Sequence, residues 1–375
     1  MPQPSQCVKS PEVNLDAVVN EVRAEYLSNV QSAPWIVGFS GGKDSTLVAH
    51  AVFQALLDIA PDKHTRPVHI IANDTLVESP LVVSHLNQSL QEIKQAADAL
   101  RLPITVAVTI PDVEHTFWVL LIGKGYPSPN SQMRWCTDRL KIAPTSKYIK
   151  DQVASCGSAI ILLGVRKNES EVRRRRIEGY ANDVDSRINP HNNLSGAYVY
   201  RPIVDLTTDE VWEILGSVPP PWGSSHSRLI KLYRDAAGGE CPIVMSPEDA
   251  PGCGTNSSRF GCWTCTVVEK DKSLQGFVDS GNHQYAPLIE FRDWLKEIRN
   301  NLNLRMGKRR TGRITVANGK LIPGPFTLDA RKMILERLLE TQQQYGDRLI
   351  SDAEIQKIHS IWANDLVAMN ENRDK

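Results

Sequence analysis

The stretch WIVGFSGGKDST at residues 35–46 restricts the fold of this 375-residue chain more than any other feature. An apolar run typical of a buried strand ends before Ser40, and a helical pattern of apolar residues follows up to Pro61. Between them, Gly41 and Gly42 have no Cβ atom, so the backbone can turn tightly and approach a ligand closely. The stretch therefore predicts a strand–loop–helix unit whose amide groups and helix start bind an anion.

The side chains of this loop suit a phosphate ligand. Lys43 adds a positive charge, its neighbours add hydroxyl donors, and Asp44 can lie near a Mg²⁺ ion or cap the helix. The other common phosphate cradle, G-x-x-x-x-G-K-[ST], is absent from the chain. The bland alternative is a turn that only starts a helix. We expect nucleotide phosphates at Ser40, Gly41, Gly42, Lys43, Asp44, Ser45 and Thr46.

Strand and helix patterns alternate through the first 205 residues. This alternation predicts an α/β fold, a parallel twisted sheet flanked by helices, with ligands at the carboxyl ends of its strands. Strands are expected at 35–39, 68–72, 104–110, 159–165 and 198–204. Helices are expected at 46–60, from Ser79-Pro80 to Leu100, after a capping box at Thr207–Glu210, and at 286–302, 327–345 and 352–368.

The cysteines are concentrated in a stretch where little regular structure is readable. Residues 217–262 are rich in Pro, Gly and Ser and hold three of the seven cysteines. We therefore divide the chain into an α/β domain at 1–216, a loop-rich cysteine region at 217–285 and a helical C-terminal region at 286–375.

The C-x-x-C at 262–265 supplies two ligands for a tetrahedral zinc site or a four-cysteine iron–sulfur cluster. Cys136 and Cys253 are the best remaining ligands, with Cys241 in reserve, whereas Cys156 is expected to be a small buried hydrophobe. Structural zinc sites usually use two C-x-x-C pairs, and a 1+1+2 arrangement over half of the chain suits a cluster better. We therefore predict an iron–sulfur cluster on Cys136, Cys253, Cys262 and Cys265.

Charge limits the possible partners of the chain. Lys plus Arg equals Asp plus Glu at 43 each, so no bulk positive field draws the protein to nucleic acid, and a local patch or a partner must do so. Residues 305–313 are basic and glycine-interrupted, which fits a DNA-backbone contact, a surface loop or a partner-docking site equally well. We find no apolar run of membrane-spanning length and no signal-peptide core at the N-terminus, so we expect a cytoplasmic protein without membrane contact.

The loop resembles the pyrophosphate loop of the ATP pyrophosphatase superfamily, which implies cleavage of ATP between the α- and β-phosphates. Segments 73–78, 163–170 and 201–205 are similar to its phosphoadenylyl-sulfate reductase branch. The resemblance implies an adenine nucleotide alpha hydrolase-like fold that binds ATP also through Asn73, Asp74, Thr75, Gly164, Arg166 and Arg173.

Lys43, Asp44, Arg166 and Glu169 are the predicted catalytic residues. The planar guanidinium of Arg166 suits phosphate, and Glu169 can orient Arg166 or a water molecule. A structural ion pair at a helix start is the alternative role for Glu169.

Segments 258–268 and 324–331 resemble the bacterial DNA phosphorothioation sulfurtransferases of the DndC and SspD type. The resemblance implies that ATP with Mg²⁺ activates a DNA backbone phosphate and that the four cysteines hold a [4Fe–4S] cluster. It also implies a cysteine desulfurase partner as the sulfur donor, and other Dnd or Ssp proteins, including an ATPase, that bind and open the DNA.

Three other functions stay open. A phosphoadenylyl-sulfate or adenylyl-sulfate reductase needs a mobile nucleophilic cysteine, and no cysteine follows Cys265. A tRNA thiolation enzyme shares the same use of ATP. A non-catalytic iron–sulfur or zinc scaffold of a DNA-processing complex ranks lowest, since it has no need of the intact loop.

Overall fold

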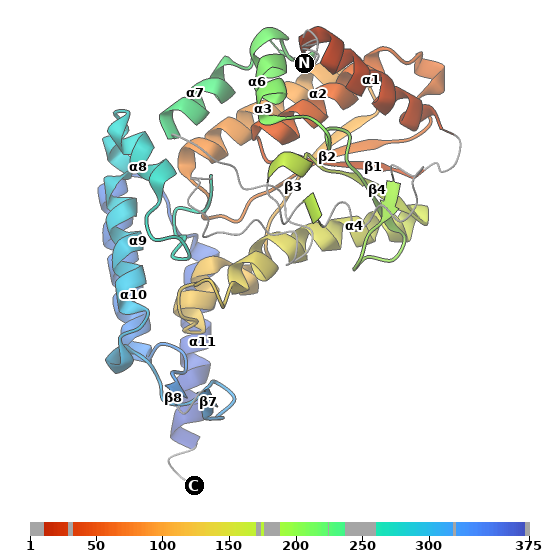
Figure 1. Ribbon diagram of the computed structural model, residues 1–375. Coiled ribbons are helices and arrows are strands. Elements are labelled where there is room, and N and C mark those ends of the chain that lie inside the picture. Colours follow the sequence, from red (N-terminus) through yellow and green to blue (C-terminus); the bar gives the residue numbers. More distant parts are fainter. Residues whose placement is uncertain are drawn as a thin grey trace, which may run out of the picture.

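A mostly parallel sheet lies at the centre of the α/β fold (Figure 1). The computed structural model describes residues 11–28, 33–169, 174–175, 188–223, 225–236, 260–317 and 320–371. Within these residues the sheet has six strands, in the order β3-β2-β1-β4-β6-β5. They are β1 (Trp35–Gly38), β2 (Val68–Asn73), β3 (Ile104–Thr109), β4 (Ala159–Leu162), β5 (Ile188–Pro190) and β6 (Ala197–Tyr200). Edge strand β5 is antiparallel to β6 and the other neighbours are parallel, which confirms the predicted sheet.

The strand order reverses at β1, which has β2 on one side and β4 on the other. Trp35 is in register with Val68 of β2 and with Ile160 of β4. In open α/β sheets, the crevice outside the carboxyl ends of the strands at such a point is the usual ligand site. The loop after β1 and the segment after β4 therefore meet where a ligand is expected.

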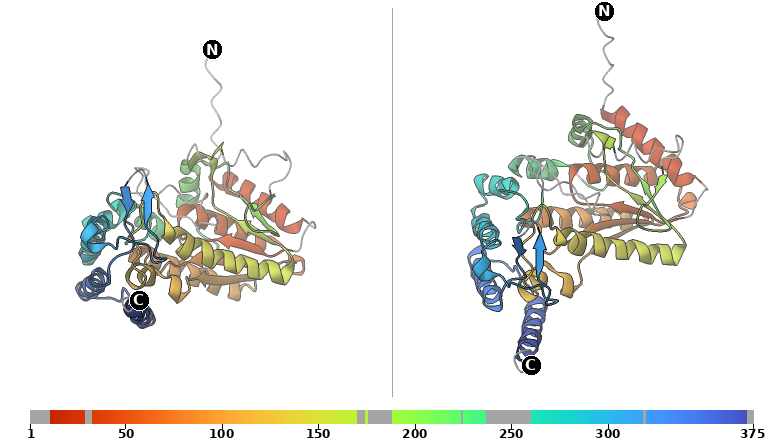
Figure 2. Two further views of the ribbon diagram at one scale, coloured as in Figure 1. Left: turned by 90° about the horizontal axis from the view of Figure 1, so that it is seen from below. Right: turned by 60° about the horizontal axis from the view of Figure 1, so that its bottom comes forward.

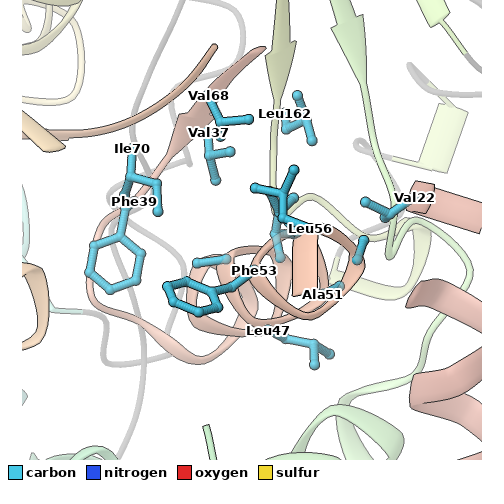
Figure 3. Close-up of a cluster of buried hydrophobic side chains, with 14 of the residues drawn as sticks. Val22, Val37, Phe39, Leu47, Ala51, Phe53, Leu56, Val68, Ile70 and Leu162 are labelled. Atoms are coloured by element: carbon cyan, nitrogen blue, oxygen red, sulfur yellow. The ribbon is translucent and has the colours of Figure 1, made fainter. Parts of the chain in front are cut away.

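Alternate side chains of the strands face two helical layers. Val37 of β1 packs in one apolar cluster with Phe53 and Leu56 of the first helix after it (Figure 3), and Ile36 lies in the opposite cluster with Ile149. Both faces are buried, as a parallel sheet requires. One face is covered by α1 (Pro11–Leu27), α2 (Lys43–Leu57), α3 (Pro80–Ala99) and α6 (Thr208–Ser217), and the other by α4 (Ala143–Cys156) (Figures 1 and 2).

A third apolar cluster organises the C-terminal part. It joins Trp118 and Leu121, from the segment between β3 and α4, to Phe291, Ile334 and Ile358 of three helices. Its elements are α8 (Lys272–Asp279), α9 (Ala286–Ile298), α10 (Leu328–Tyr345) and α11 (Asp352–Glu371), and the hairpin of β7 (Thr315–Ala317) and β8 (Lys320–Ile322) is inserted before α10. No helix in the described ranges is both long and apolar enough to cross a membrane.

Several expected elements are confirmed, and others differ in their bounds. The capping box of Thr207 and Glu210 is present at the start of α6. α2 begins at Lys43 instead of residue 46, because Gly42 is already its N-cap. β6 ends at Tyr200, since residues 201–204 form a turn closed by the Val204 amide on the Arg201 carbonyl.

Two expectations about the cysteines and the segments around them were wrong. The stretch expected to be irregular contains α7 (Ser227–Ala236), whose apolar residues are spaced as on one face of a helix. Cys156 is exposed instead of buried, because it lies at the C-terminal end of α4.

Candidate active site

The loop after β1 closes upon itself. The Ser45 hydroxyl donates to the Gly42 carbonyl at 3.0 Å and accepts the Ser40 amide at 3.2 Å. Gly41 has a φ of +74°, which glycine adopts without strain. Gly42 caps α2 without a side-chain hydrogen bond, so the helix start keeps amide donors available to an anion. The buried hydroxyl of Thr46 also has no hydrogen-bond partner among the described residues, which suits a bound oxygen atom at the loop.

Asp44 joins the two predicted catalytic cations. Its carboxylate accepts from Lys43 Nζ at 2.8 Å and from Arg166 Nε at 2.5 Å, and its side chain is 6% exposed. Burial alone would raise the pKa of the Asp44 carboxyl, but the charges and hydrogen bonds of Lys43 and Arg166 hold this pKa below its ordinary value. Asp44 thus fixes both cations at the loop, and both of its oxygens already have cationic partners.

Arg166 is buried and its guanidinium has internal partners. Besides Asp44, it donates to the Thr208 hydroxyl at 3.1 Å, at the start of α6. Glu169 does contact Arg166, but through the backbone: its carboxylate accepts the Arg166 amide at 2.9 Å. The predicted pairing of Arg166 with phosphate stays a prediction.

Gly164 meets the start of α2. A Cβ atom on Gly164 would lie 2.7 Å from the Asp44 carbonyl carbon and 2.8 Å from the Ser45 amide nitrogen. The resemblance implies that Gly164 binds the nucleotide, and the structure shows that the start of α2 lies directly against it. Gly164 therefore sets how closely the segment after β4 lies against the loop.

The segment after β2 connects the nucleotide edge to the cysteines. Asn73 donates to the Leu140 carbonyl at 3.0 Å, and the Asp74 carboxylate accepts the Leu76 amide at 2.8 Å. Burial raises the pKa of the Asp74 carboxyl, although its hydrogen bond with Leu76 opposes the rise. Thr75 is fully buried, and its hydroxyl lies 3.5 Å from the Sγ atom of Cys262.

Residues 261–263, which include Cys262, pair with the residues that follow Thr75. The Ser79 amide donates to the Gly261 carbonyl at 3.2 Å, and the Trp263 amide donates to the Val77 carbonyl at 3.0 Å. This short antiparallel pairing places Glu78 opposite Cys262. The C-x-x-C is therefore hydrogen-bonded to a segment that begins at the carboxyl end of β2, next to β1 and its loop.

Three thiols of the predicted cluster lie in the described part of the chain. Burial raises the pKa of the Cys262 thiol, the charges of Glu78 and Cys136 raise it further, and Lys141 opposes them. Lys141 forms an ion pair with Glu78 at 3.2 Å. The Cys262 thiol therefore lies next to a half-buried ion pair.

Cys265 has different surroundings. Burial raises the pKa of its thiol, whereas hydrogen bonds from the Val267 and Val268 amides lower it. Such amide–sulfur bonds suit a thiolate ligand of a cluster. Across the residues with described positions, however, no three metal-ligating side chains are gathered at one point. The donor chemistry fits a thiolate-bound cluster, and the four-cysteine set stays a prediction because Cys253 lies outside the described residues.

Two more predicted positions, Arg173 and the reserve ligand Cys241, also lie outside the described residues. The basic segment at 305–313 is only partly free for a ligand: Arg305 donates to the Gly324 carbonyl, and Arg310 pairs with Asp365 at 2.6 Å. For the rest of this segment, a DNA-backbone contact, a surface loop and a partner-docking site stay equally open.

Sequence reasoning missed the residues that hold the site from behind. The Lys43 amide donates to the Tyr233 hydroxyl at 3.3 Å, and the Tyr233 ring packs against Phe260, two residues before Cys262. Arg292 of α9 is fully buried and donates to the Cys265 carbonyl at 2.8 Å. The amphipathic pattern of α7 could have drawn attention to Tyr233, whereas nothing local distinguishes Arg292 from a surface arginine.

Comparison with known proteins identifies a family for most of this region. The family model of the phosphoadenosine phosphosulfate reductase domain matches residues 34–268. No curated protein shows a significant match to the sequence.

Three solved structures are similar to part of the chain. FMN adenylyltransferase from Candida glabrata with FAD and inorganic pyrophosphate is 12% identical over 62% of this chain and 65% of its own, just under two thirds, at a TM-score of 0.35. Phosphoadenylyl-sulfate reductase from Candida auris in its phosphate complex is 14% identical over 58% and 92%, at 0.34. The U34-tRNA thiolase NcsA from Methanococcus maripaludis with its [4Fe-4S] cluster is 14% identical over 58% and 70%, at 0.33. At these identities and TM-scores the three structures do not bear on activity.

Proposed function

Because the chain belongs to the phosphoadenosine phosphosulfate reductase domain family, we propose that it is an ATP pyrophosphatase that acts in sulfur transfer. It cleaves ATP between the α- and β-phosphates, releases pyrophosphate and leaves an adenylate on its acceptor. The acceptor in this proposal is a DNA backbone phosphate, whose non-bridging oxygen is replaced by sulfur. The resemblance of segments 258–268 and 324–331 to phosphorothioation sulfurtransferases supports that choice.

One observation carries the proposal: residues 261–263, which include Cys262, pair through an antiparallel bridge with the segment at 77–79, just beyond β2. This pairing brings Cys262 within 3.5 Å of the Thr75 hydroxyl. The phosphate loop follows β1, the strand next to β2, so the loop and the segment that pairs with Cys262 both follow the carboxyl ends of neighbouring strands. A common edge supports a single centre for phosphate activation and sulfur chemistry.

The residues of the chain take distinct parts in the proposed reaction. Loop amides at the start of α2 hold the β- and γ-phosphates, and Lys43 offsets the charge of the departing pyrophosphate. Asp44 keeps Lys43 and Arg166 oriented through its two hydrogen bonds. Mg²⁺ bound to the phosphate oxygens supplies further positive charge. The terminal sulfur of a persulfide from a cysteine desulfurase partner then attacks the activated phosphorus, and the P–O bond to AMP breaks. A thiol reductant then cleaves the S–S bond, so that the sulfur stays on the phosphorus.

The proposed cluster has a structural or electron-transfer part. Cys136, Cys253, Cys262 and Cys265 would hold a [4Fe–4S] cluster, and a cluster with four cysteine ligands has no open iron for sulfur. DNA contact depends on partners, namely other Dnd or Ssp proteins that include an ATPase, because the chain has zero net charge. We place this work in the cytoplasm.

Release of pyrophosphate from ATP tests the proposed activity. Lys43→Ala and Asp44→Ala should each abolish release and leave the visible absorption of anaerobically purified protein unchanged. Lys167→Ala is the matched control, since Lys167 follows Arg166 and its side chain, 38% exposed, pairs with Asp205. Release at the wild-type rate in both loop variants would refute the assignment of the loop.

Reduction of adenylyl-sulfate or phosphoadenylyl-sulfate is the second candidate, because the family model itself is named for it. Sulfite formed from either nucleotide with a thiol reductant, without ATP cleavage, would favour the reductase. Sulfur incorporation with purified desulfurase, measured on DNA and tRNA in parallel, decides between the two acceptors.

A further inference from the structure

His85 of α3 lies against the outer side of the phosphate loop. Its side chain is buried, and its Nε2 atom is 2.9 Å from the Gly41 carbonyl oxygen. A Cβ atom on Gly41 would lie 3.4 Å from the ring carbon Cδ2 of His85. The imidazole therefore contacts the turn of the loop directly, at the glycine that allows the turn.

The tautomer of His85 follows from its second partner. Arg228 of α7 directs Nε to the His85 Nδ1 atom at 3.4 Å, and its two terminal nitrogens bind the Glu92 carboxylate at 3.1 and 2.9 Å. A guanidinium donates and cannot accept, so Nδ1 accepts and Nε2 carries the proton. Burial also lowers the pKa of His85 to about 4, so the ring is neutral at neutral pH. The Nε2–H group thus donates to the Gly41 carbonyl.

This hydrogen bond determines the direction of the next amide. In a trans peptide, the carbonyl of one residue and the N–H of the next point in opposite directions. With the Gly41 carbonyl directed at His85, the Gly42 N–H points into the loop, where it donates a long hydrogen bond to Ser40 Oγ at 3.4 Å. Gly41 and Gly42 have no side chains to restrict this peptide, so an outside contact has to hold it.

We propose that His85 is a positioning residue of the phosphate loop, which together with Arg228 and Glu92 holds the Gly41–Gly42 peptide so that its N–H faces the pyrophosphate group of a nucleotide. The identity of that ligand rests on the proposed function, and the orientation of the peptide rests on the hydrogen bonds alone. We call this series of hydrogen bonds, from Glu92 through Arg228 and the His85 ring to the Gly41 carbonyl, the relay.

Calorimetric binding of inorganic pyrophosphate, with Mg²⁺, to the full chain tests this proposal. His85→Leu removes the donor and should weaken binding about tenfold, the effect of one hydrogen bond of about 1.4 kcal/mol. His85→Gln keeps an N–H donor for the carbonyl and an oxygen acceptor for Arg228, and should stay within about threefold of the wild type. His69→Leu is the control, because His69 bonds Tyr148 of α4 on the opposite face of the sheet.

The two variants of His85 distinguish a positioning role of this residue from a packing role. Equal weakening by Leu and Gln would show that only the shape of the ring matters and would overturn the proposal, as would wild-type affinity in His85→Leu. Steady-state kinetics add a second readout: the KM for ATP should rise more than kcat falls. If the wild type binds pyrophosphate as expected but never releases it from ATP, the relay stands and the proposed reaction falls.

Discussion

Gly164→Ala tests the contact between the segment after β4 and the phosphate loop. The added Cβ would lie 2.7 Å from the Asp44 carbonyl carbon and 2.8 Å from the Ser45 amide nitrogen. Both atoms belong to the backbone at the start of α2, so no side-chain rotation relieves the clash. Overpacking of this kind costs about 1–3 kcal/mol, and we expect the free energy of unfolding to fall by that amount.

Urea denaturation followed by tryptophan fluorescence measures this change. Gly216→Ala is the matched control: a Cβ atom on Gly216, in the last turn of α6, would have no neighbour within 4 Å among the described residues. Alanine is favoured over glycine in helices, so the control should be neutral or more stable by up to about 1 kcal/mol. Equal stability of Gly164→Ala and the wild type would refute the close approach.

The same variant separates two explanations of Gly164. If the glycine serves the loop helix, as the structure shows, stability and pyrophosphate release should fall together. If it serves the ligand, as the sequence suggested, release should fall while the free energy of unfolding stays unchanged. The two measurements on one protein therefore decide which neighbour requires a glycine.

Two further predictions concern buried polar groups. Arg292→Met should lower the free energy of unfolding by about 3 kcal/mol and speed alkylation of Cys265 in metal-free protein, because the Arg292 side chain is 0% exposed and its guanidinium donates to backbone carbonyls such as that of Cys265. Arg337→Met is the control: it removes a contact with the Trp294 ring and should cost about 1 kcal/mol or less. Equal effects of the two variants would contradict the reasoning. Burial lowers the pKa of His50 to about 3, whereas the unfolded chain takes up its proton below about pH 6.5, so the contribution of His50 to stability is full above pH 6.5 and should fall by about 2 kcal/mol between pH 7 and pH 5. Urea midpoints at the two pH values check this, and an unchanged pH dependence in His50→Leu would contradict it.

The parallel sheet and the place of the loop were predictable because they depend on local patterns. A buried strand, two glycines and an amphipathic helix occur within 35–57, and each follows from neighbouring residues. The capping box at Thr207 was predictable for the same reason, since its partner Glu210 is three residues away. α7 was missed because the Pro, Gly and Ser around it hid a short amphipathic stretch.

The surroundings of the site were not predictable, because they join residues far apart in the chain. Thr75 and Cys262 are separated by 187 residues, and Asp44 and Arg166 by 122. The hydrophobic periodicity of a segment does not predict such a contact, because the contact depends on how distant helices and strands pack together. The Arg166 guanidinium, which is predicted to bind phosphate, is buried against Asp44 and Thr208, and neither contact could be read from the sequence.

The sequence by itself determined that a glycine loop ends a parallel strand and that cysteines occur in a C-x-x-C spacing, because turn chemistry, hydrophobic period and ligand spacing are properties of adjacent residues. Only the tertiary structure decided that residues 261–263 pair with the segment after β2. The same is true of the contacts of His85 with the Gly41 carbonyl and of Gly164 with the start of α2. These contacts come from burial, which brings distant apolar stretches into common cores and carries the polar groups between them into hydrogen-bond distance.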